Sequence, residues 1–236
     1  MCGTFATNGS GTWREYRGQI DVDWSESPGD AGPRFNIRPT DLAPMVRLVD
    51  GRLSIECAHW WLIPAASNGA PSRKYPMFNA RSETLAEKRS YREPFLRQRG
   101  VLPVSAFAER ARSGNLAGWW SVSNDAGAMA VAALWDVWKG EGREVLSVTM
   151  VTTAAAPEFA PWHSRMPVML TRDECDHWLD NSIPVPADDP LFRPELKFPL
   201  ILAPLDGTVG NVRDKSPQTM VPAGEQVRLQ LDGLGG

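Results

Sequence analysis

The sequence has few of the features that mark membrane, secreted or metal-binding proteins. None of its apolar runs approaches the ~18 residues that a membrane-spanning helix needs. No basic start leads into an apolar stretch, so we expect no signal peptide. Three cysteines among 236 residues are too few and too scattered for a disulfide framework or a zinc site. We therefore expect a cytoplasmic protein in a reducing environment, with no membrane partner, metal or cofactor.

The sequence also lacks the excess of positive charge that is typical of non-specific nucleic-acid binders, since its net charge is −3. The cations are nevertheless concentrated between Arg73 and Arg112, where glutamates are few. This segment is either a solvated helix face or a functional basic patch. Ten tryptophans accompany only three tyrosines. We expect most of them in the core and a few on a cleft wall, where they could stack on nucleobases.

Apolar segments separated by turn signals predict a strand-rich fold. Asp50-Gly51 indicates a hairpin, and Thr171 with Glu174 indicates a capped helix over 171–181. A longer helix is expected at 82–98, with Ser82 as its N-cap and Pro94 as its limit. The segment 25–41 is expected to be loop-rich. Strands are expected at 43–64 as the hairpin, 99–110, 118–124, 128–138, 144–155 and 198–205, with 118–124, 128–138 and 144–155 forming a β-meander.

These elements predict an α+β fold: a single domain whose strand-rich core is a bent sheet or an open β-barrel, with a few short flanking helices. The domain is expected to cover residues 1–222, and residues 223–236 to form a flexible tail.

The position of Cys2 suggests a specific chemistry. If Met1 is removed, Cys2 carries an α-amine and a thiol on adjacent carbons, with reference pKa values near ~7.7–8.0 and ~8.5. Such an aminothiol condenses with an aldehyde to an imine, and the thiol then closes a five-membered ring. The alternative is that the cysteine stands there by accident.

Two further segments place a titratable group in apolar or rigid surroundings. Glu109 lies beside Phe107, so partial desolvation should raise its pKa and suit a general acid. Its neighbour Arg110 should point to the opposite face of the strand. His163 stands between two prolines, which suits a site loop, whereas His59 and His177 are interpreted as structural.

The amide of Asn79, in "MFNARSE", could point into a cleft. On the residues alone, each of these positions is better explained by a structural role, because a lone glutamate at a strand end is usually a surface residue and an asparagine at a helix entry usually caps it.

The order of motifs carries a resemblance. Cys2 is followed by "FNIRPT", "WLIP", "NARSET", "LPVSAFAE", "VTTAA", "HSRMP" and "VGNVRDKSP". This order resembles the SRAP family of abasic-site processing proteins, which includes the bacterial SOS-response-associated proteins. The resemblance extends from Cys2 to about residue 217, and "NARSET" and "HSRMP" are its most specific pieces.

The resemblance implies a sensor of abasic sites in single-stranded DNA and near junctions with duplex, which acts in the DNA damage response. The N-terminal cysteine would form a thiazolidine crosslink, and the same site would remove the initiator methionine. It implies four catalytic residues: Cys2 as nucleophile, Asn79 orienting its amine and thiol, Glu109 as acid and base, and His163 assisting proton transfer. It also implies a monomer.

The resemblance further implies DNA contacts. Arg81 would bind a backbone phosphate and Pro39 would pack beside the lesion, while Arg73 and Lys74 could replace a tryptophan that the family carries in this loop. The chain departs from the family at Thr4, where arginine is usual, and at Ala108 and Arg110 around the glutamate. We expect these changes to affect DNA affinity more than covalent chemistry.

Two other functions remain open on the sequence. An N-terminal-nucleophile cysteine peptidase or amidohydrolase would use Cys2 as an acyl acceptor. A non-covalent module for single-stranded DNA would leave Cys2 without a role.

Overall fold

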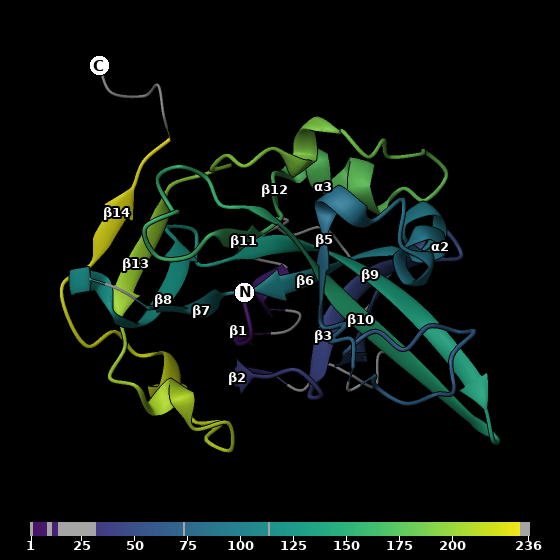
Figure 1. Cartoon of the computed structure of the whole chain (residues 1–236), viewed down its shortest axis with the longest axis horizontal. Helices are drawn as coiled ribbons and strands as arrows, with labels where there is room; N and C mark the ends of the chain where they lie inside the picture. The colour runs from purple at the N-terminus through teal and green to yellow at the C-terminus, as the bar shows by residue number, and fades with distance from the viewer. Residues whose placement is uncertain (1, 9–10, 14–31, 73, 113, 232–236) are drawn as a thin grey trace.

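The computed structural model describes residues 2–8, 11–13, 32–72, 74–112 and 114–231 (Figure 1). Strands dominate these residues. They are β1 Phe5–Thr7, β2 Arg34–Ile37, β3 Leu42–Val49, β4 Arg52–Trp60, β5 Asn79–Arg81, β6 Arg99–Val104, β7 Ala106–Ala111, β8 Gly118–Asn124, β9 Met129–Gly140, β10 Arg143–Ala154, β11 Arg165–Pro167, β12 Met169–Leu170, β13 Leu200–Pro204 and β14 Val227–Leu229. The α-helices described are α2 Arg89–Arg97 and α3 Arg172–Leu179. Single 3₁₀ turns, η1 to η5, lie at Ser82–Thr84, Gly114–Leu116, Pro190–Phe192, Thr208–Gly210 and Pro217–Met220.

Five strands close into a barrel. The strands β4, β3, β6 and β9 are antiparallel neighbours in that order, and β10 pairs with both β9 and β4 to complete the ring. Two tight turns make this possible: Asp50-Gly51 has φ of 50° and 75°, and Glu141-Gly142 has φ of 52° and 70°. Such left-handed pairs match the twist of a hairpin. The predicted fold class and the predicted hairpin are confirmed, and the barrel is closed.

A second sheet has the strand order β14-β13-β8-β7-β1-β2 (left and centre of Figure 1). The segment 99–110, predicted as one strand, passes between the two sheets: β6 belongs to the barrel, Ser105 interrupts it, and β7 belongs to the second sheet. The predicted meander is wrong, because β8 pairs with β7 and β13 rather than with β9, so that of its three strands only β9 and β10 pair with each other. This crossing brings the N-terminal strand β1 beside the barrel.

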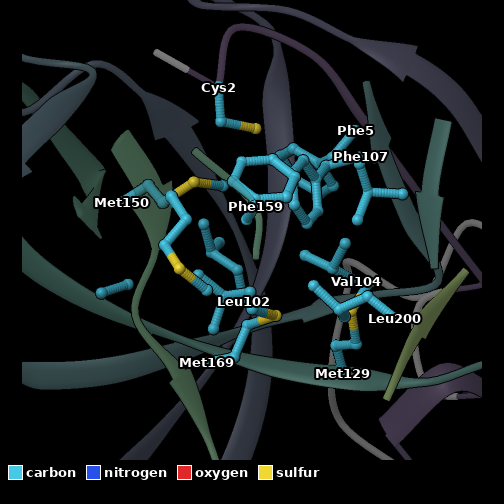
Figure 2. Close-up of a cluster of buried hydrophobic side chains, with 14 of the residues drawn as sticks. Cys2, Phe5, Leu102, Val104, Phe107, Met129, Met150, Phe159, Met169 and Leu200 are labelled. Carbon is cyan, nitrogen blue, oxygen red and sulfur yellow. The ribbon is translucent and has the colours of Figure 1, made fainter. Parts of the chain in front are cut away.

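Strand alternation explains the two main hydrophobic clusters. Along β9, Met129, Val131 and Ala133 face one cluster, while Ala130, Ala132 and Leu134 face the other. The first cluster fills the barrel and continues onto the inner face of the second sheet, where Phe5 and Phe107 join it (Figure 2). The second cluster lies under α2 and α3 and includes Trp178. The prediction that most tryptophans are core residues fits Trp60 and Trp178, both fully buried.

The longer helix differs from its prediction. The segment 82–98 forms the 3₁₀ turn η1 and then α2, and Ser82 caps neither of them. Pro94 lies inside α2 rather than ending it. A proline there costs one backbone hydrogen bond, but the burial of Pro94 beside Tyr91 and Phe95 offsets this cost. The short helix α3 has the predicted capping box of Thr171 and Glu174.

Two predicted irregular segments contain strands. The segment 25–41, predicted to be loop-rich, includes β2, which pairs with β1, and its residues up to 31 lie outside the described ranges. The predicted flexible tail from residue 223 includes β14, which pairs with β13. The domain boundary at 222 stays a prediction. No helix within the described ranges is long and apolar enough to cross a membrane.

Candidate functional site

Cys2 lies where the second sheet meets the barrel sheet. It precedes β1, only 1% of its surface is exposed, and its Sγ lies 3.5 Å from the carbonyl oxygen of Thr4. From the other sheet, Asn79 Nδ2 donates a 2.7 Å hydrogen bond to the carbonyl oxygen of Cys2. Figure 2 shows the thiol at the edge of the buried cluster, above Phe159. The cysteine that sequence analysis singled out is therefore fixed from both sides rather than frayed.

Asn79 is placed by strand pairing. It opens the short strand β5, which runs parallel to β10 with Asn79 opposite Met150. Its Oδ1 is buried and has no hydrogen-bond partner among the described residues, although its Nδ2 is bonded to Cys2. A buried acceptor without a hydrogen bond costs free energy, so a neighbouring group that donates a hydrogen bond to this oxygen would be stabilised there.

Glu109 lies inside the fold. Its exposed fraction is 3%, and burial raises the pKa of its carboxyl to about 7. Its neighbour Arg110 is exposed, so the predicted alternation along β7 is confirmed. Burial also raises the pKa of the Cys2 thiol, and the negative charge of Glu109 raises it further. The charge of Glu109 thus acts on the thiol of Cys2.

His163 follows the turn that contains Phe159 and Trp162. Its Nδ1 lies 3.0 Å from both the backbone nitrogen and the carbonyl oxygen of Arg165, which fixes the ring. Burial lowers the pKa of His163, and the charges of Arg112 and Arg165 lower it further. The charge of Arg112, which follows β7, also lowers the pKa of Glu109.

The residues predicted to contact DNA differ in their exposure and in their partners. Arg81 is exposed at the end of β5, and no carboxylate of the described chain pairs with it. The neighbouring acid, Glu83, binds Arg165 through two hydrogen bonds of 2.5 and 3.0 Å. Pro39 is half-buried in the turn between β2 and β3.

Lys74 is exposed on the loop before β5, and its ammonium lies 5.3 Å from the ring of Tyr75. It lines a hollow of about 560 Å³ together with Arg89. Arg73 lies outside the described residues.

The basic segment is only partly a surface patch. Arg99 is fully buried and donates hydrogen bonds to backbone carbonyls that include those of Phe95, Trp178 and Asp180. Arg97 pairs with Glu93 at 3.0 Å. Through these hydrogen bonds Arg99 connects β6 to α2 and to the end of α3, so its role is structural.

Sequence analysis missed Asn36, which organises the surroundings of Cys2. It is fully buried, with a left-handed φ of 47° that asparagine tolerates better than most residues. Its Oδ1 accepts from Thr4 Oγ1 at 2.8 Å and from Arg38 Nε at 2.7 Å. Its Nδ2 donates to the carbonyl oxygens of Asn211 and Asp214. Thr4, where the family usually has arginine, is thus a buried structural partner.

A family model identifies the chain's relationship. The model described as SOS response associated peptidase (SRAP) matches residues 1–212. The chain belongs to the SRAP family. The resemblance inferred from the motifs is therefore confirmed.

Curated SRAP relatives share a name. Abasic site processing protein YoqW of Bacillus subtilis is 27% identical over 195 residues, which cover 76% of this chain and 80% of that protein. Abasic site processing protein HMCES of Pongo abelii is 24% identical over 265 residues, which cover 94% and 74%. A crystal structure of a protein from Bacteroides thetaiotaomicron matches with a TM-score of 0.72 and 20% identity over 94% of this chain and 98% of that one. This last likeness concerns the fold.

Proposed function

We propose that this SRAP protein processes abasic sites in DNA and that Cys2 forms a thiazolidine crosslink with the lesion. The observation that carries the proposal is the position of Cys2: its carbonyl is bonded to Asn79, and the field of the buried Glu109 reaches its thiol. The names of the curated relatives support the choice of DNA lesion. The relatives' names support abasic-site processing as the general activity, and the crosslink is the chemistry that we propose for it.

The first step frees the nucleophile. Water adds across the Met1–Cys2 peptide bond, which releases methionine and leaves Cys2 with a free α-amine. The buried Oδ1 of Asn79 is the acceptor for this amine, because it lies on the same side chain that already binds the Cys2 carbonyl. Asn79 would then orient both groups of the aminothiol.

The next steps are proton transfers around an aldehyde. The cyclic sugar opens when its C1′ hydroxyl loses a proton and its ring oxygen gains one. The amine attacks the C1′ aldehyde, and water leaves as the imine forms. The thiol sulfur then bonds to the same carbon, and its proton ends on the nitrogen. A carboxyl with a pKa of about 7 is suited to both giving and taking protons near neutral pH.

His163 supplies the second proton-transfer group. Its pKa is lowered, so the imidazole is largely neutral at pH 7 and can accept a proton. The ring is fixed through Nδ1 by the backbone of Arg165. The DNA backbone around the lesion would be contacted by Arg81, Lys74 and Arg73, since Arg81 and Lys74 lie exposed and phosphate recognition favours basic side chains. Pro39 would pack beside the lesion.

The test is a denaturing gel with single-stranded DNA that carries one abasic site. Wild type should form a covalent adduct whose mass equals processed protein plus DNA minus one water, and undamaged DNA should give none. Cys2→Ala should form no thiazolidine, and Cys57→Ala, which removes the half-buried thiol of β4, serves as the matched control. Intact mass spectrometry should also show the loss of Met1.

Other outcomes would favour the competing functions. Equal adduct formation by wild type and Cys2→Ala without a reductant would contradict the thiazolidine. Turnover of an amide substrate that depends on Cys2, without an adduct, would favour the amidohydrolase. DNA binding with no adduct in any variant would favour the non-covalent module.

A further inference from the structure

A hollow at the end of β7 lies next to the candidate catalytic groups. Its volume is about 520 Å³, and it is lined by Arg110, Ala111, Arg112, Ala117 and Gly118. Gly118 is the cross-strand partner of Ala111, so the hollow lies at the end of the β7–β8 pair where the connecting loop begins. Glu109 stands on the same strand, one residue before Arg110, and its side chain is buried on the opposite face.

The two arginines are exposed and lack acidic partners. No carboxylate in the described ranges lies within ion-pair distance of Arg110 or Arg112. Some exposed arginines do have such a partner, since Arg97 pairs with Glu93, Arg143 with Glu141, and Arg228 with Asp125, whereas Arg81, like the two arginines of the hollow, has none among the described residues. Two neighbouring cations with no carboxylate partner among the described residues leave a positive field in the hollow, and the charge of Arg112 reaches Glu109 and His163.

We propose that this hollow binds a backbone phosphate of the DNA strand next to the abasic nucleotide. The inference rests on the proposed function, since it places the DNA that Cys2 would attack. A guanidinium presents paired N–H donors that match the oxygens of a phosphate. Two of them on one rim can hold a phosphate from two directions. In this arrangement the buried Glu109 would face the sugar of the abasic nucleotide. The exposed Arg110 and Arg112 would face the DNA backbone.

The test measures non-covalent binding. Wild type, Arg110→Gln, Arg112→Gln and the double variant are titrated with single-stranded DNA that carries a tetrahydrofuran residue, which has no aldehyde and cannot crosslink. Arg228→Gln is the matched control, because Arg228 is also exposed but pairs with Asp125 on the second sheet. Each single variant should bind about five- to tenfold more weakly. The slope of log affinity against log salt concentration should become shallower by about 0.7 for each phosphate that the variant no longer neutralises.

A second DNA series locates the phosphate. A neutral methylphosphonate replaces one linkage at a time on either side of the tetrahydrofuran residue. One position should weaken binding by wild type and leave the double variant unaffected, because that variant has no arginine to bind the linkage. The proposed phosphate site would be refuted if the double variant kept the affinity and the salt dependence of wild type. It would also be refuted if no methylphosphonate position weakened binding by wild type more than binding by the double variant.

The same proteins separate this proposal from the crosslinking chemistry. If wild type forms no adduct with abasic DNA but the arginine variants still bind more weakly and with a shallower slope, the phosphate site stands and the thiazolidine does not. If wild type forms the adduct and the arginine variants bind as wild type does, the chemistry stands and the phosphate site is refuted.

Discussion

The ends of β7 and β5 both place a glutamate close to an arginine, with opposite results. At β7, Glu109 is buried, and burial raises its pKa to about 7 although Arg110 is its chain neighbour. At β5, Glu83 lies two residues after Arg81 and is bound by Arg165. Burial acts to raise the pKa of Glu83, but the hydrogen bonds and charge of Arg165 outweigh it and lower the pKa.

The residues adjacent in sequence therefore do not determine the pKa values of Glu109 and Glu83. Strand alternation sends Arg110 to the opposite face from Glu109, whereas β11 brings Arg165 to Glu83 from 82 residues away. A protonated carboxyl near pH 7 can act as an acid, and a permanently ionised one can only pair. We therefore expect Glu109 at β7 to be the acid of the proposed chemistry, and Glu83 near β5 to serve as an ion-pair partner.

The largest expected effect separates these two acids. Glu109→Gln keeps the shape of the side chain but removes its titratable proton, so crosslinking should slow by about 10²-fold or more. Glu83→Gln should slow it by less than about threefold, the scale of a partly exposed ion pair. Single-turnover crosslinking rates from pH 5 to pH 9 measure both, and the wild-type rate should fall above pH 7. Equal crosslinking rates for the two variants would contradict the assignment of different roles to Glu109 and Glu83.

The second prediction concerns stability against pH. The pKa of Glu109 in the folded protein, about 7, lies above its ordinary value of 4.5. As pH rises between these values, the unfolded chain releases this proton and the folded chain keeps it. The stabilisation from Glu109 is therefore complete below pH 4.5 and is lost as pH rises through 7.

Urea denaturation measures this sign. Glu109→Gln should gain stability relative to wild type on the order of 3 kcal/mol between pH 4.5 and pH 8. Glu83, whose pKa is lowered, should behave oppositely: its stabilisation is present above pH 4.5 and is lost as pH falls below 4.5, so Glu83→Gln should lose stability relative to wild type as pH rises towards 4.5, with no further change above it. A difference for Glu109→Gln that stays constant with pH would contradict the raised pKa.

The third prediction concerns the residue that connects the two regions. His163 contacts the backbone of Arg165, whose side chain binds Glu83, while the charge of Arg112 reaches it from β7. His163→Ala should slow crosslinking by about tenfold. Combined with Glu109→Gln, the loss should be smaller than the product of the two, because both groups serve one proton path. A fully multiplicative loss would show independent roles.

Much of this arrangement could be predicted from the sequence because it depends on local pattern. Alternation along 106–111 indicated which way Glu109 and Arg110 point, and Asp50-Gly51 and Thr171 marked a turn and a helix start. The motifs that carry Cys2, Asn79, Glu109 and His163 led to one region of the fold. Their catalytic roles stay predictions.

The remainder depends on contacts between distant segments. Ser105 carries no turn signal strong enough to reveal that 99–110 changes sheets. Asn36 reaches Asn211, 175 residues away, so nothing near it in the sequence indicates its hydrogen bonds. Arg99 lies in a basic segment that the sequence leaves open as a solvated helix face or a functional patch, because burial of an arginine is visible only once backbone carbonyls from α2 and α3 surround it.

The smallest expected effect concerns the exposed cation of β5. Arg81 has no acidic partner among the described residues, whereas Arg97, also exposed, pairs with Glu93 on the face of α2. Arg81→Ala should weaken binding to single-stranded DNA several-fold without a base preference, and the salt slope should shrink by about one phosphate contact. Arg97→Ala is the control and should leave both quantities unchanged, since its ion pair is solvent-exposed and its neighbour Glu93 cancels its field. Fluorescence anisotropy at several salt concentrations measures both variants. If Arg81→Ala and Arg97→Ala behaved alike, lack of an acidic partner would not be what marks a DNA contact in this protein, and the case for the arginines at the end of β7 would weaken with it.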